Sequence, residues 1–166
     1  MMLDIRVLWL WLHLLGVILW AGGFFYVLMT LVPAMGSSKA TEDRVDIMQK
    51  AIAQFRRISW IAILLIIVSG VFNLIKRIGE GQAARELSTQ PENYPLLPEG
   101  YMAVFGIKMF VVVGLIVHQA VKLLDPRVLD DGRIGLKSKA SGIVAGVLFM
   151  VAILLGLVLL TMNMSV

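Results

Sequence analysis

Residues 7–38 read VLWLWLHLLGVILWAGGFFYVLMTLVPAMGSS and contain no Asp, Glu, Lys or Arg. An α-helix needs about 20 apolar residues to cross roughly 30 Å of hydrocarbon, and this stretch is longer than that. It is also longer than the ~7–15 apolar residues of a secretory signal, and no convincing cleavage site follows it. The stretch therefore predicts a retained transmembrane helix at about residues 7–33.

Three further apolar stretches follow the first. Residues 58–75, 100–120 and 140–166 contain one charged side chain among them, that of Lys108. Lipid offers no partners to backbone N–H and C=O groups, so such segments must be helical. We therefore expect residues 1–166 to form a single all-α domain, an integral membrane four-helix bundle. Its helices should span about residues 7–33, 56–76, 100–123 and 139–163.

The composition agrees with a membrane protein and excludes several kinds of site. Hydrophobic residues make up 59% of the 166 residues and charged residues 16%, whereas soluble domains are roughly 45–50% apolar. The chain has no cysteine, which excludes disulfides, iron–sulfur clusters and covalently attached c-type haem. The net charge of +4 comes from short segments between the apolar runs. We therefore expect lipid headgroups to be its counter-charge, and we expect no nucleic acid partner.

The distribution of Lys and Arg predicts the orientation. The first and third connecting segments together hold ten of these residues, whereas the N-terminus and the second connection hold four. Cytoplasmic loops carry the excess of positive charge. Both termini should therefore lie on the outer, periplasmic side of a bacterial inner membrane.

Two ionisable side chains lie at the same expected depth. His13 is about six residues, roughly 9 Å, below the outer start of the first helix at 1.5 Å per residue. Lys108 is about seven residues below the outer start of the third helix near Tyr101. His118 lies ten residues further along, near the cytoplasmic end. Ionisable residues in a membrane usually face the bundle interior and mark function, so His13 and Lys108 form the candidate pair.

A stripe of small and aromatic residues accompanies His13. Helical spacing places Gly16 and Trp20 on its face, and Gly23 follows in the Gly22-Gly23 pair. These glycines would permit close approach of a neighbouring helix or of a flat ligand. A neutral histidine beside a small residue and a tryptophan plane suits an axial haem ligand. The alternative is a histidine that is hydrogen-bonded to a neighbouring helix.

Lys108 has more than one possible role. Its flexible stem would allow it to reach outward to the membrane surface. If it faces the bundle, it would bind a propionate or another carboxylate or, once neutral, ligate a metal itself. We favour the inward orientation. For His118, we favour an interfacial position near Arg56, Arg57 and Trp60.

Methionine supports a different cofactor. Several of the ten methionines are expected near the outer face: Met1, Met2, Met102, Met109, Met162 and Met164. Thioethers are soft ligands for Cu(I), so a copper site at the outer end of the bundle is the alternative to haem. Such residues are, however, more often packing side chains.

The segment LHLLGVILWAGGFFYVLMTLVPA resembles the first helix of CopD-domain membrane proteins and of the related HemJ-type protoporphyrinogen oxidases. FRRISWIAILLIIVSGVFNLI and YMAVFGIKMFVVVGLIV are similar to the second and third helices of CopD proteins. In the first helix, the pattern is a histidine, a tryptophan seven residues later, small residues and an aromatic pair. These places are held by His13, Trp20, Gly22, Gly23, Phe25 and Tyr26.

This resemblance implies a membrane haem b protein in which His13 and Lys108 are the functional pair, or a copper uptake or resistance module. We expect a b-type haem between the first and third helices, with His13 as an axial ligand. Its chemistry would be electron transfer or a porphyrin- or quinol-linked oxidation, which would make the chain an oxidoreductase or a subunit beside other membrane subunits or further copies of itself. A purely structural subunit is the third hypothesis. We expect the cofactor face to consist of the following residues: His13, Lys108, Trp20, Gly16, Gly23 and Tyr26.

Overall fold

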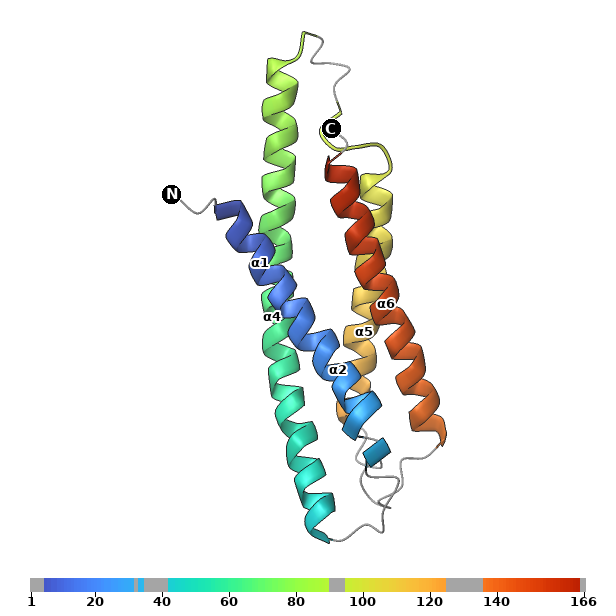
Figure 1. Ribbon diagram of the computed structural model, residues 1–166. Helices are drawn as coiled ribbons and strands as arrows, with labels where there is room; N and C mark the ends of the chain where they lie inside the picture. Colours follow the sequence, from blue (N-terminus) through green and yellow to red (C-terminus); the bar gives the residue numbers. More distant parts are fainter. Residues whose placement is uncertain (1–4, 32, 35–41, 90–94, 125–135, 165–166) are drawn as a thin grey trace.

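The computed structural model describes residues 5–31, 33–34, 42–89, 95–124 and 136–164, and its elements are all helical. The described residues form four long helical rods, which run alternately up and down in Figure 1. The first rod is built from α1 (Ile5–Val17), the π-helical turn η1 (Ile18–Gly22), α2 (Gly23–Tyr26) and a second π-helical turn, η2 (Val27–Leu31). The other three are α4 (Glu42–Leu87), α5 (Tyr101–Leu124) and α6 (Leu136–Met164). The end at which α5 begins and α6 ends is called the upper end below.

All four rods are long and apolar enough to cross a membrane. Their outward faces carry large apolar side chains, such as Ile18 (65% exposed), Ile61 (67%) and Phe110 (80%). A surface this apolar is stable only where lipid covers it. The expected all-α fold with four membrane helices is therefore confirmed, and the chain is a multi-pass membrane protein in contact with the bilayer.

The second rod differs from the sequence prediction. A helix was expected at about residues 56–76, whereas α4 runs without a break over the 46 residues from Glu42 to Leu87. At 1.5 Å per residue it is roughly 69 Å long, more than twice the thickness of the hydrocarbon core. Apolar content marks only the part of a helix inside lipid. The flanking polar segments contain no proline and therefore continue the helix. The sequence offers Thr41 as an N-terminal cap for a helix in the first connecting segment, and Thr41 lies outside the described residues.

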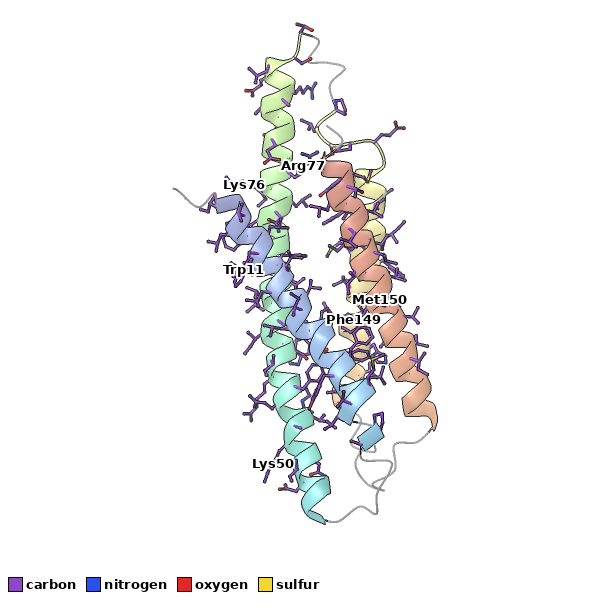
Figure 2. The ribbon with its side chains drawn as sticks, in the orientation of Figure 1. Trp11, Lys50, Lys76, Arg77, Phe149 and Met150 are labelled. Carbon is purple, nitrogen blue, oxygen red and sulfur yellow. The ribbon has the colours of Figure 1, made fainter. Side chains whose placement is uncertain are left out.

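The rods pack most extensively as two pairs, α1 with α4 and α5 with α6. The pairs meet in a core in the lower half, which contains the buried residues Trp20, Ala21, Ala62, Ile63, Leu115, Ala145, Phe149 and Ala152. Alanine is frequent there because small side chains let membrane helices approach closely. Figure 2 shows Phe149 between the pairs, where its ring packs edge-on against Trp20 with centroids 4.8 Å apart.

Gly16 is where α1 lies closest to α4. A Cβ atom at this position would lie 2.8 Å from Ile66 Cγ1 and 3.1 Å from the carbonyl oxygen of Ala62. A backbone atom cannot move aside without moving the helix, so any side chain at residue 16 must push the two helices apart.

We therefore expect Gly16→Ala to lower the free energy of unfolding by about 1–3 kcal/mol, the usual cost of overpacking. Gly22→Ala is the matched control, because a Cβ there meets nothing within 4 Å. Unfolding of the purified protein by SDS in mixed micelles measures both. Equal stability of the two variants would show that the close approach at Gly16 is not required.

Candidate functional site

Above the apolar core, the inward faces of the helices become polar. His13 lies on α1, Asn73 and Arg77 lie on α4, and Tyr101 and Lys108 lie on α5, all of them half-buried. Ser69, also on α4, is fully buried. In an apolar bundle, side chains of this kind are costly unless they bind one another or a ligand. The upper half of the interior is therefore the candidate site.

The hydrogen bonds of His13 determine which ring nitrogen carries the proton. Its Nδ1 lies 3.1 Å from the carbonyl oxygen of Ile66 and 3.1 Å from Ser69 Oγ. Ser69 itself donates to the carbonyl oxygen of Leu65 at 2.5 Å. A carbonyl oxygen can only accept, and the serine proton is already used, so Nδ1 is the donor to both. In the neutral ring, Nε2 is then left with a free lone pair.

The backbone of α4 makes room for this imidazole. A Cβ atom on Gly70 would lie 3.3 Å from His13 Cε1, tighter than most real Cβ contacts, and 3.5 Å from its Nδ1. The ring thus packs directly over the main chain of α4. Contacts with Gly70, Ile66 and Ser69 together fix its orientation.

Lys108 faces the interior, as favoured from the sequence. Its Nζ lies 3.4 Å from the position that a Cβ on Gly156 of α6 would take. The two residues that the depth count pairs are both half-buried above the core, where the His13 ring packs on α4 and Lys108 packs against α6.

His118 lies apart from this pair, at the lower end of α5. Its Nε2 shares a 2.6 Å hydrogen bond with Ser141 Oγ of α6. The sequence predicts an interfacial position near Arg56, Arg57 and Trp60. The hydrogen bond to Ser141 joins α5 to α6 and gives this polar residue a partner at that depth.

The other residues of the expected cofactor face are engaged in packing or point outward. Trp20 donates from Nε1 to Gln119 Oε1 at 2.6 Å and packs on Phe149. Gly16 lies against α4, and a Cβ on Gly23 would collide with the ring of Phe55. The Tyr26 side chain is 60% exposed on the outer surface. Gly16 and Gly23 thus allow the close approach of a neighbouring helix, which was one of the two alternatives predicted for these glycines.

Sequence analysis missed two residues of the polar interior. Ser69 was noted only as part of a family pattern, and Arg77 was counted as a charge of the connecting segment. A regular spacing along α4 would have revealed both: Ile66, Ser69, Asn73 and Arg77 recur at three or four residues, the repeat of one helix face.

The donors present are compatible with a haem, which needs fewer protein ligands than a bare metal ion. Within the described residues, no three His, Cys, Asp or Glu side chains gather into a metal-binding group. A bare transition metal usually takes three or four protein ligands, whereas haem iron takes four nitrogens from the porphyrin and only one or two from the protein. His13, with its Nδ1 bonded to a carbonyl and its Nε2 free, has the form of an axial ligand.

Fold and site together define a four-helix, multi-pass membrane protein with a polar upper interior. Comparison of the chain with protein-family models, with curated proteins and with solved structures gave no match.

Proposed function

We propose that this chain is a membrane b-type haem protein that takes part in electron transfer or in porphyrin- or quinol-linked oxidation. His13 is the axial ligand, and Lys108 is either the second ligand or a charge partner of the cofactor. Bound haem would supply one-electron oxidation and reduction inside the bilayer. The resemblance of the first three helices to CopD and HemJ proteins supports the same assignment.

The observation that carries the proposal is the double hydrogen bond of His13 Nδ1 to Ile66 O and Ser69 Oγ. Histidines that bind metals almost always donate their other ring nitrogen to a carbonyl or a similar acceptor, which fixes the tautomer and makes the ligand more basic. Both acceptors lie on α4, so Nδ1 carries the proton and the unprotonated Nε2 keeps the lone pair that a haem iron would take.

The topology supports an orientation. In the proposed arrangement, the upper end of the bundle faces the periplasm of a bacterial inner membrane, and the Lys- and Arg-rich lower connections face the cytoplasm. The haem site then lies in the outer half of the bilayer. Electron partners at that depth include a quinone in the membrane and a neighbouring subunit.

Ser69→Ala tests the support given to His13. Outer-shell partners of metal-binding histidines typically contribute 10–100-fold to metal affinity. Because Ile66 O remains as an acceptor in this variant, we expect haem affinity to fall about tenfold. Titration of the purified apoprotein with haem, followed at the Soret band, gives the affinity.

Ser59→Ala is the matched control for this experiment. Ser59 is equally buried on the same helix, and its Oγ has no hydrogen-bond partner, so we expect unchanged haem affinity. If both variants bind haem as the wild type does, Ser69 does not support a ligand. A wild-type chain that binds copper tightly and haem not at all would contradict the proposal itself.

A further inference from the structure

Arg77 is a half-buried cation whose hydrogen bonds are incomplete. Its side chain is only 17% exposed, and its Nε is buried without a hydrogen-bond partner. Its Nη1 lies 3.6 Å from Glu80 Oε2, which is long for a charge-assisted hydrogen bond. Figure 2 shows Arg77 on the side of α4 toward α5 and α6, whereas Lys76 lies on the other side. A buried N–H donor without a partner is costly, and the Nε–H of this guanidinium lacks an acceptor.

Arg77 is in register with the His13 site. It follows Gly70, which contacts the His13 ring, by seven residues. This spacing is two helical turns, roughly 10 Å, along the same face of α4. On the antiparallel helix α5, Tyr101 precedes Lys108 by the same seven residues.

The two helices therefore form two matched layers. The lower layer holds His13 and Lys108. The upper layer holds Arg77 on α4 and Tyr101 on α5, and the half-buried Asn73 lies between the layers on α4. A ligand bound at His13 could extend toward the upper end. A group of that ligand about 10 Å from the atom bound to His13 would then lie at the level of Arg77.

We infer that Arg77, with Tyr101 beside it, binds a carboxylate of the ligand held at His13. This inference rests on the proposed function. It names the ligand as a porphyrin whose propionate carboxylates point to the upper end. The Nε–H of Arg77 donates to the carboxylate, and Glu80 keeps its contact with Nη1. Arg77 rather than Lys108 is then the carboxylate partner, since a planar guanidinium presents matched donors to a carboxylate.

The test compares haem b with haem b dimethyl ester, in which both propionates are neutral. The full-length protein is titrated with each in an uncharged detergent, so that no lipid phosphate is supplied. For the wild type, we expect the diacid to bind about 10- to 100-fold more tightly than the diester, since hydrogen bonds to charged groups have this strength. Arg77→Gln should reduce the ratio to near one by weakening the diacid alone. Arg77→Lys, which keeps the charge, should give an intermediate ratio.

Lys76→Gln is the matched control, since Lys76 is the exposed neighbour, and it should leave the ratio unchanged. Equal binding of diacid and diester by the wild type overturns the inference, whether or not the variants fold. So does a ratio that survives Arg77→Gln but is lost in Lys108→Met, which would make Lys108 the carboxylate partner. In both cases binding of haem through His13 still stands. A wild-type chain that binds neither form overturns the inference and the proposed function together.

Discussion

Alanine in place of His13 is expected to abolish stable haem binding, with an affinity more than about 100-fold below that of the wild type. Loss of an outer-shell partner already costs 10–100-fold, and this change removes the axial nitrogen itself. The protein should still fold, because the buried core lies below His13 and does not include it. Haem per chain after purification, together with the melting temperature, separates loss of the ligand from loss of the fold.

His118→Ala is the control for this experiment. His118 lies at the lower end of α5 and is bonded to Ser141, so its removal should leave the haem content unchanged. Full haem retention by His13→Ala, or an equal loss in both variants, would contradict the assignment of His13 as the ligand.

The second large effect is expected at Trp20, which is 4% exposed at the centre of the core. Trp20→Ala should lower the free energy of unfolding by about 3–5 kcal/mol, as in other cores that lose a large aromatic side chain. The change removes the packing on Phe149 and also the donor to Gln119 Oε1. Because Gln119 Nε2 already lacks a partner, the whole amide would be left buried and unpaired.

Trp11→Ala provides the matched control. Trp11 lies on the same rod but is 58% exposed on the outer surface, visible at the edge of the bundle in Figure 2. Its loss should change stability little. Trp20→Phe should fall between the two, since it keeps a ring against Phe149 and loses only the hydrogen bond. If SDS unfolding shows the same stability for the Trp11 and Trp20 alanine variants, the core has been wrongly located.

Most of the fold was predictable because lipid restricts the choices. A long uncharged stretch in a bilayer can only be a helix, so four stretches gave four rods. The error in α4 has a physical reason: hydropathy reports where a helix lies in lipid and is silent about how far it continues into water. The polar residues at both ends of α4, which runs from Glu42 to Leu87, are helical as well.

The site was predictable only in part. Counting depth paired His13 with Lys108, because a helix rises by a fixed length per residue. The packing of the helices decides which neighbour each face of α1 contacts. This packing cannot be predicted from the apolar pattern of a single sequence. Gly16 was therefore compatible with a helix or a porphyrin, and only the contact with Ile66 shows that it meets a helix. Arg77 was assigned to a loop because α4 was expected to end there.

The central claim is that His13 holds a redox-active haem inside the bundle. Its most direct test is the absorption spectrum of the purified full-length chain, supplied with haem and recorded in the oxidised and the reduced state. The account predicts a Soret band that shifts reversibly on reduction, with sharp visible bands in the reduced form and about one haem per chain. A purified, folded chain that shows no Soret band after exposure to haem would contradict it.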